Sequence, residues 1–285
     1  MITVLAVHFA VAAVAPFIFR KFGRSSFYAL AAVPAGSFVW LLLQHGAVYA
    51  TAGPHGSGSG GHSSEVTPWI PDLGMEFAFR LDALAWVMSL LVLGVGALVL
   101  LYCARYFQNK DQYLGGFGAQ LLAFAGAMFG LVTADDLLLL FIFWELTTVL
   151  SYLLIGYART RLAARRSALQ ALMVTTAGGL AMLVGLIMLG SAAGTYRISA
   201  ILEQAPDLVA GPAAGAVGAA VVLILVGAVT KSALVPFHFW LPGAMAAPTP
   251  VSAYLHAAAM VKAGVYIVAR LAPGFTETAY WLPLV

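Results

Sequence analysis

Two lysines of this chain lie inside long apolar runs, where a charge needs unusual surroundings. Lys231 and Lys262 belong to the stretch LVGAVTKSALVPFHFWLPGAMAAPTPVSAYLHAAAMVKAG, residues 225–264. An ammonium group at bilayer depth costs at least ~3 kcal/mol on insertion scales. Two such charges in one stretch predict that both face a polar interior. The simpler alternative is that both lysines lie at helix ends and extend their ammonium groups to the headgroups.

The same stretch contains residues that break helices. Pro236 and Pro242 interrupt the apolar run that follows Lys231. A proline inside a membrane helix leaves a backbone carbonyl without its hydrogen bond, and protein or water must supply a partner. We therefore expect a broken helix, followed by an intact one near residues 251–270, and expect both to line a hydrated path.

An acid occupies the middle of another apolar segment, DDLLLLFIFWELTTVLSYLLIGY. Glu145 follows Asp136 by roughly 13 Å of helix, which places it near mid-bilayer. A bare carboxylate at that depth would take up a proton. A lysine partner changes this balance, and Lys231 is the natural candidate. The alternative is a permanently protonated Glu145 that only hydrogen-bonds between helices.

The composition is that of a membrane protein with many spans. The 285 residues are 62% hydrophobic and 9% charged, whereas soluble domains carry about 25% charged residues. The net charge of +3 is small, so nucleic acid is not an expected partner. One cysteine, Cys103, allows no internal disulfide and is expected to pack as a small apolar residue. No pattern indicates a nucleotide, flavin, haem or other cofactor.

Apolar runs of about 20 residues predict the membrane helices. We expect an all-α bundle with helices near 2–19, 27–50, 81–104, 113–132, 137–157, 167–190, 214–235, 238–247 (short), 251–270 and from 278. Three parts follow, namely residues 1–112 with an external loop at 51–80, a five-helix unit at 113–270, and the start of a further helix at 271–285.

The basic residues favour one side of the membrane. Nine lie in the loops after the first, third and fifth helices: Arg20, Lys21, Arg24, Arg105, Lys110, Arg159, Arg161, Arg165 and Arg166. The opposite side carries three, Arg80, Arg197 and Arg270. The positive-inside rule places the nine in the cytoplasm. We therefore expect a multi-pass protein of the cell membrane with an external N-terminus.

The loop at 51–80 combines two kinds of sequence. The tract GPHGSGSGGHSS is typical of a flexible linker, and its two histidines have no third metal ligand nearby. The segment WIPDLGMEFAFRLD alternates apolar and polar residues, which predicts a short strand or hairpin at the membrane surface. Asp82 and Asp136 precede apolar helices and are expected to be N-caps.

Three motifs resemble a known family. They are FWELTTVLSYLLIGY around Glu145, TKSALVPFHFWLPGAMAAPTPVSAYLHAAAMVKAG around both lysines, and FAFRLDALAWVM before the third helix. They resemble the large antiporter-like subunits shared by respiratory complex I and the Mrp-type multisubunit cation/proton antiporters. Within the family, they most resemble the A-type subunits of the Mrp antiporters. The corresponding complex I subunit usually has an acid where this chain has Gly179, and often lacks a lysine at the position of Lys262.

The resemblance implies a proton path. Glu145 would be the modulating acid, Lys231 the first proton carrier, His238 and His256 the relay, and Lys262 the central carrier. For His256 the alternative is a hydrogen bond to a neighbouring helix, and for His238 a structural role at the helix break. The resemblance also implies other subunits of a hetero-oligomeric antiporter, and protons with Na⁺ or a similar cation, as partners.

The resemblance also exposes a difference in length. Family members repeat helices 4–8 as an inverted second unit, and this chain ends just inside its ninth helix. We expect a fragment of a longer protein. Two other functions stay open, namely a proton-pumping subunit of NADH:quinone oxidoreductase and a truncated scaffold. The buried set of Glu145, Lys231 and Lys262 argues against a scaffold.

The charge asymmetry gives a topological prediction. Cysteines introduced by Ser59→Cys and Thr160→Cys, each with Cys103→Ala, would be exposed to an impermeant thiol reagent on intact cells. Ser59→Cys should be labelled from outside and Thr160→Cys only after the membrane is opened. External labelling of Thr160→Cys would reverse the orientation.

Overall fold

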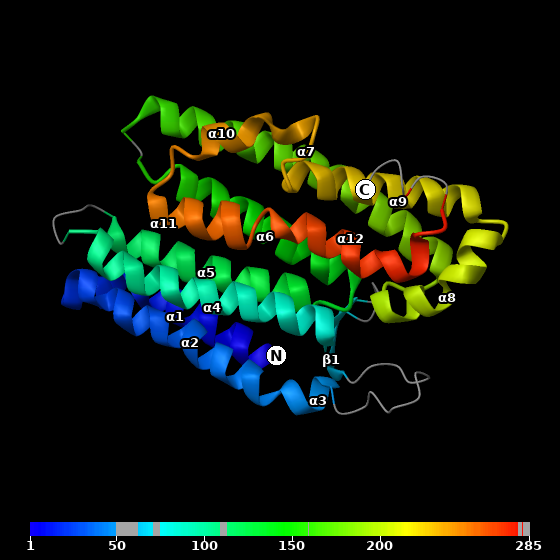
Figure 1. Cartoon of the computed structure of the whole chain (residues 1–285), viewed down its shortest axis with the longest axis horizontal. Coiled ribbons are helices and arrows are strands. Elements are labelled where there is room, and N and C mark those ends of the chain that lie inside the picture. The colour runs from blue at the N-terminus through cyan, green and yellow to red at the C-terminus, as the bar shows by residue number, and fades with distance from the viewer. Residues whose placement is uncertain (50–61, 71–74, 109–112, 159, 279–280, 282–285) are drawn as a thin grey trace.

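The computed structural model describes residues 1–49, 62–70, 75–108, 113–158, 160–278 and 281, and it shows a bundle of long helices (Figure 1). Within those residues, seven stretches are long and apolar enough to cross a membrane. They are Ile2–Leu43, Ala83–Tyr106, Leu114–Thr133, Leu137–Ile155, Leu162–Ala193, Ala214–Lys231 and Thr249–Phe275. The predicted all-α polytopic fold is confirmed.

The first of these stretches contains two helices. α1 (Ile2–Phe22) and α2 (Ser26–Leu43) are joined by a turn at Gly23, whose φ of 56° suits a residue without a side chain. The two helices lie side by side, and α1 packs on α5 (Leu114–Thr133) while α2 packs on α4 (Ala83–Tyr106) (Figure 1). A short α3 (His45–Tyr49) follows, so α2 ends earlier than residue 50.

A β-hairpin lies at one end of the bundle. β1 (Ser63–Ile70) pairs antiparallel with β2 (Met75–Leu81), with an irregularity between Pro68 and Ile70. The predicted surface hairpin is confirmed. Its first strand begins inside the tract expected to be a linker, because Ser63 and Ser64 pair with Leu81 and Arg80. His62 is exposed, and His55 lies outside the described residues.

Both predicted N-caps are confirmed. The Asp82 carboxylate accepts a hydrogen bond from the Ala85 amide at 3.0 Å, and α4 begins there. The Asp136 carboxylate accepts from the Leu138 and Leu139 amides at 2.9 and 2.8 Å and starts α6 (Leu137–Ile155). Burial raises the pKa of Asp136 above its ordinary value. Cys103 is buried, as expected.

Asp82 has a second role, because it joins the first helices to the last. The guanidinium of Arg270, on α12 (Lys262–Phe275), donates to both carboxylate oxygens of Asp82, and its Nε donates to the Tyr266 hydroxyl at 3.0 Å. Tyr266 in turn donates to the Val132 carbonyl of α5 at 2.9 Å. Burial alone would raise the pKa of Asp82, but the hydrogen bonds and charge of Arg270 outweigh it and hold that pKa below its usual range.

α7 (Leu162–Ala193) and α9 (Ala214–Lys231) form the closest helix pair of the bundle. A Cβ at Gly227 would lie 2.6 Å from the Met182 Cβ and 2.9 Å from the Gly178 carbonyl oxygen. A Cβ at Gly185 would lie 2.5 Å from the Ala220 carbonyl oxygen. Small residues therefore allow the two backbones to touch, as they do in many membrane bundles.

Two elements differ from the sequence prediction. α8 (Ile198–Ala210) is an amphipathic helix between α7 and α9 that was not predicted, because it is too short and too polar to count as a span. It buries Ile198, Ile201, Ala205 and Leu208. The helix expected to run intact over 251–270 is broken, as described below. The helix expected from 278 lies mostly outside the described residues.

The clamp between Asp82 and Arg270 predicts a measurable contribution to stability. Asp82→Asn or Arg270→Gln should lower the free energy of unfolding by about 2 kcal/mol, because each removes the hydrogen-bonded partner of a largely buried charge and leaves Asp82 at most the longer contact with Arg80 at 3.7 Å. The double variant should lose less than the sum of the singles. Since the pKa of Asp82 is lowered in the folded protein, its contribution is present at neutral pH and lost as pH falls through the folded pKa.

Thermal unfolding of the full-length protein across pH would measure these effects. Arg197→Gln is a suitable control, because Arg197 is more exposed and reaches its acids only at 3.6 and 3.7 Å. Equal losses in the control and in Arg270→Gln would contradict the clamp.

Candidate functional site

The helix that carries Lys231 ends at that residue, and new hydrogen bonds satisfy its last turn. After α9 the chain turns through Ala233, whose φ is 52°, and continues into the 3₁₀ turn η3 (Phe237–Phe239) and the short α10 (Trp240–Ala244). The Trp240 indole donates to the Thr230 carbonyl at 3.0 Å. The predicted broken helix is therefore confirmed. The Trp240 indole supplies a hydrogen-bond donor for a carbonyl in the last turn of α9.

The helix that carries Lys262 is also broken, which corrects the expectation of an intact helix. It consists of α11 (Thr249–Val251), a π-helical segment η4 (Ser252–Ala258), and α12, which begins at Lys262 itself. At the junction Ala259 leaves helical geometry, with φ −126° and ψ −72°. No proline or glycine stands between His256 and Lys262, so the sequence carried no signal of this break. Segments of π-helix are frequent at functional sites.

The two breaks are joined to each other. The Ser232 hydroxyl, one residue after Lys231, donates to the Val261 carbonyl, one residue before Lys262, at 2.7 Å. Gly264 lets this approach occur, because a Cβ there would collide with the Ser232 hydroxyl and the Ala228 carbonyl. The residues that follow Lys231 and precede Lys262 are therefore in direct contact, although α9 and α12 are separate elements.

The ammonium group of Lys231 is fully buried and held by neutral oxygens of α6. Its Nζ donates to the Trp144 carbonyl at 2.6 Å and to the hydroxyls of Thr147 and Thr148 at 2.7 and 3.0 Å. It also lies 4.3 Å from the centre of the Trp144 ring, at cation–π distance. The side chain is thus satisfied in the interior, whereas the snorkelling alternative would need a route to the headgroups.

Glu145 does not make the predicted direct contact with Lys231. Among the ion pairs of the described residues, none joins these two side chains. The reason is helix phase, since the Glu145 carboxylate points at Gly179 of α7 while Trp144, Thr147 and Thr148 present their oxygens to Lys231. The buried Glu145 Oε1 has no hydrogen-bond partner, and neither does the nearby indole nitrogen of Trp144.

His256 lies on the π-helical segment and is buried, with its ring 6.2 Å from the ring of Trp240. Neither ring nitrogen has a protein partner. Trp240 therefore contacts both the His256 ring and the carbonyl of Thr230, the residue before Lys231. The alternative of a hydrogen bond from His256 to a neighbouring helix is not what the structure shows.

Lys262 and His238 are exposed in this chain. Lys262 has apolar neighbours on the same surface, with Val265 53% exposed, so its ammonium faces a side of the bundle that would otherwise be apolar. His238 lies in η3 near Phe239 and Val235, which are also exposed. The structure thus gathers Glu145, Lys231 and His256 inside the bundle and leaves Lys262 and His238 at its edge.

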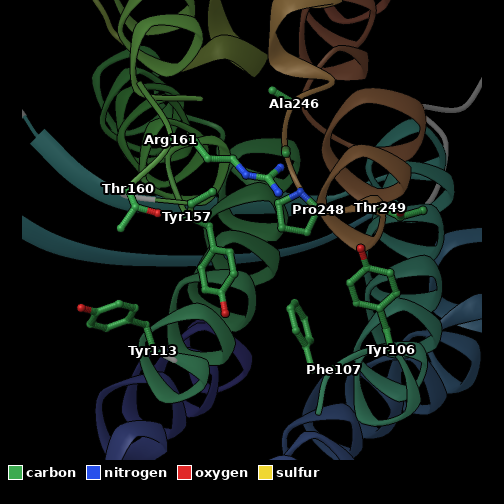
Figure 2. Close-up of a pocket in the computed structure, with 11 residues that line it drawn as sticks. Tyr106, Phe107, Tyr113, Tyr157, Thr160, Arg161, Ala246, Pro248 and Thr249 are labelled. Carbon is green, nitrogen blue, oxygen red and sulfur yellow. The ribbon is translucent and has the colours of Figure 1, made fainter. Parts of the chain in front are cut away.

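A cavity of about 610 Å³ opens at the end of the bundle where α4 and α6 end and α7 begins. Figure 2 shows the Arg161 side chain extending toward Pro248, with the rings of Tyr157, Phe107 and Tyr106 beneath it. Thr249, the first residue of α11, also lines the cavity, one turn before the π-helical segment. The cavity therefore lies at the start of the broken helix that carries His256 further along.

Comparison with known proteins places this geometry in a family. Residues 134–284, more than half of the chain, match the family model described as the transmembrane region of NADH:quinone oxidoreductase and Mrp antiporters. The chain belongs to this family. A second model, the N-terminus of chain 5 of NADH-ubiquinone oxidoreductase (complex I), matches residues 69–117.

Curated relatives in the family are antiporter subunits. The chain is 48% identical over 227 residues to a probable K⁺/H⁺ antiporter A/B subunit from Rhizobium meliloti, a match that spans 80% of this chain and 22% of the relative. It is 46% identical over 223 residues to the Na⁺/H⁺ antiporter A subunit from Alkalihalophilus pseudofirmus. This match spans 78% of this chain and 27% of the relative. The chain thus covers about a quarter of the length of these relatives.

A solved structure shares the fold. The Mrp complex from Dietzia sp. DQ12-45-1b contains a chain that superimposes with a TM-score of 0.87 at 39% identity, covering 99% of this chain and 29% of that one. The predicted resemblance to the A-type subunits of Mrp antiporters is therefore confirmed at the level of family and fold.

Several site residues were not found from the sequence. The sequence contains no indication of a role for three of them, Trp144, Trp240 and Ser232, because an indole or a hydroxyl in an apolar run is common in membrane helices. Thr147 and Thr148 follow Glu145 in an apolar helix, where threonines commonly serve ordinary helix packing. Their spacing from Trp144 was the usable signal, since residues three and four positions apart share a helix face.

Gly179 yields a prediction about Glu145. Gly179→Ala would place a methyl group against the Glu145 carboxylate and force that side chain to another rotamer. Under the transport function proposed below, cation-dependent proton exchange by the full-length protein in its complex should fall at least tenfold while assembly is retained. Gly36→Ala is the control, because nothing lies within 4 Å of a Cβ there. Normal exchange in Gly179→Ala would show that the Glu145 position has no bearing on transport.

Proposed function

We propose that this chain is the ion-translocating part of a subunit of a monovalent cation/proton antiporter, and that protons pass through its buried polar residues. The names of the relatives support the reaction class, since they are Na⁺/H⁺ and K⁺/H⁺ antiporter subunits. This would make the chain part of a secondary transporter, with further subunits and a monovalent cation as partners. Its place would be the cell membrane, with the N-terminus outside.

The observation that carries the proposal is the set of ligands around Lys231. Its ammonium is fully buried but bound by a carbonyl and two hydroxyls, with no carboxylate in contact. A threonine hydroxyl can accept a hydrogen bond from an ammonium or donate one to a neutral amine. The pocket can therefore satisfy Lys231 in both protonation states, which a proton carrier requires and a fixed ion pair does not provide.

Glu145 is proposed to tune this lysine from a short distance. One carboxylate oxygen lies against Gly179 and has no hydrogen-bond partner, so no hydrogen bond to that oxygen holds the side chain in its present rotamer. Movement toward Lys231 would stabilise the ammonium, and movement away would favour release of its proton. Glu145 is thus assigned the modulating role and Lys231 that of first carrier.

The remaining steps follow the joined breaks. His256 has two buried nitrogens without protein partners, which ordered water would satisfy. We assign it the relay role, with Lys262 as the next carrier, reached across the contact between Ser232 and Val261. His238 is assigned a role at the edge of the path. The aromatic cavity at Thr249 would be the cytoplasmic entrance, and residues 113–270 the translocating unit.

The alternative function is a proton-pumping subunit of NADH:quinone oxidoreductase, which the family description also names. Gly179 favours the antiporter, because the complex I subunit usually has an acid there. Neighbouring genes would separate the two functions, since complex I requires iron–sulfur and flavin subunits.

The proposal predicts mutual dependence of Glu145 and Lys231. Glu145→Ala, Lys231→Ala and the double variant should each abolish cation-dependent proton exchange in everted vesicles of the complete multisubunit background. The double variant should assemble at least as well as either single, because it leaves no unpaired buried charge. Thr147→Val combined with Thr148→Val should also reduce exchange, since it removes two of the three oxygens that hold Lys231.

Lys21→Gln, an exposed basic residue outside the site, is the control and should transport normally. Near-normal exchange in either single alanine variant would refute the working pair. A double variant that assembles worse than both singles would show that the two residues do not offset each other's burial.

A further inference from the structure

A second cavity, of about 490 Å³, lies between the end of α6 and the first two turns of α7. Its lining comes from Tyr152, Leu153, Gly156, Leu162, Arg165, Arg166, Ala168 and Leu169. The cavity is separate from the residues assigned to proton transfer. Nothing in the proposed transport mechanism explains two arginines at its rim.

Among the described residues, no acidic side chain forms an ion pair with the arginines. Arg165 and Arg166 are both exposed, and within the described residues neither guanidinium takes part in an ion pair or side-chain hydrogen bond. The lining contains no acidic residue, and the only acid on α6 or α7 is Glu145, which points at Gly179 further along the helix. The rim therefore has two positive charges that attract an anion.

The surface below the arginines is apolar. Leu153, Leu162 and Leu169 line the cavity and are 39%, 56% and 47% exposed. Met173, one turn further along α7, is 58% exposed and extends the same face. A cationic rim above an apolar groove matches a molecule with an anionic head and a hydrocarbon tail.

The position in the membrane agrees with this chemistry. α7 has 32 residues and is roughly 48 Å long, whereas the hydrocarbon core of a bilayer is about 30 Å thick. Its first turns therefore reach the headgroup region. They do so at the end of the bundle that holds most basic residues, where anionic lipids of the cytoplasmic leaflet concentrate.

We propose that the groove between α6 and α7 binds an anionic phospholipid, with the phosphate at Arg165 and Arg166 and one acyl chain along Leu169 and Met173. Binding requires both the charge of the rim and the apolar floor. A diacyl phosphatidylglycerol contacts both, whereas a free phosphate ion contacts only the arginines. This inference does not rest on the proposed transport function, because it concerns a surface outside the proton path.

The test is lipid binding to the full-length complex, measured by native mass spectrometry in detergent with added phosphatidylglycerol or phosphatidylcholine. Wild-type complex should retain phosphatidylglycerol in preference. Arg165→Gln with Arg166→Gln should weaken that retention about thirtyfold at this one site, as expected for two basic side chains at an anionic headgroup. Arg165→Lys with Arg166→Lys should keep most of it and would show that the fold is intact.

Arg20→Gln with Lys21→Gln is the matched control, because it removes two exposed charges from the same end of the bundle. Unchanged retention in the Gln pair, or equal loss in the control, would overturn the site. Complete displacement of the lipid by millimolar inorganic phosphate would show an anion site without a lipid. Cross-linking of Leu169→Cys, with Cys103→Ala, to another subunit would show that a protein helix covers the groove instead.

Discussion

The burial of one ammonium group sets the conditions for the rest of this structure. Lys231 has no exposure and no carboxylate in contact, so its cost of burial is offset by the three oxygens of α6 and the face of Trp144. The three oxygens come from one face of α6, and Lys231 reaches them from the last residue of α9. The helix break thus begins at the residue that carries the buried charge.

The sequence predicted the features that depend on local patterns, namely the membrane spans and the helix caps. It did not predict the features that depend on tertiary contacts. Apolar runs predicted the spans, and Asp82 and Asp136 predicted two helix starts, because caps depend on local geometry. The break before Lys262 could not be predicted, since HAAAMVKAG is a good helical sequence and the π-helical turn depends on tertiary contacts such as that of Ser232 with Val261. α8 was missed because its apolar face is too short to count as a span.

The sequence predicted which residues form the candidate site, but it did not predict which of their groups touch each other. Charged residues in apolar runs identified Glu145, Lys231 and Lys262, because burial of charge is rare and visible in a sequence. These contacts depend on how α6 is rotated about its axis. A shift of one residue along α6 separates Trp144, which contacts Lys231, from Glu145, which faces Gly179. Periodicity gives a helix and its length, but it does not give the neighbour that each face meets.

The glycine contacts between α7 and α9 have a mechanical consequence. At Gly185 and Gly227 the two helices approach more closely than a Cβ would allow, so a larger side chain at either position would push α7 and α9 apart. The short pieces around Lys231 and Lys262 have turns in place of continuous helix and a single hydroxyl link between them. A shift of either helix break would therefore strain the hydrogen bond between Ser232 and Val261, which links the backbone beside Lys262 to the residue after Lys231.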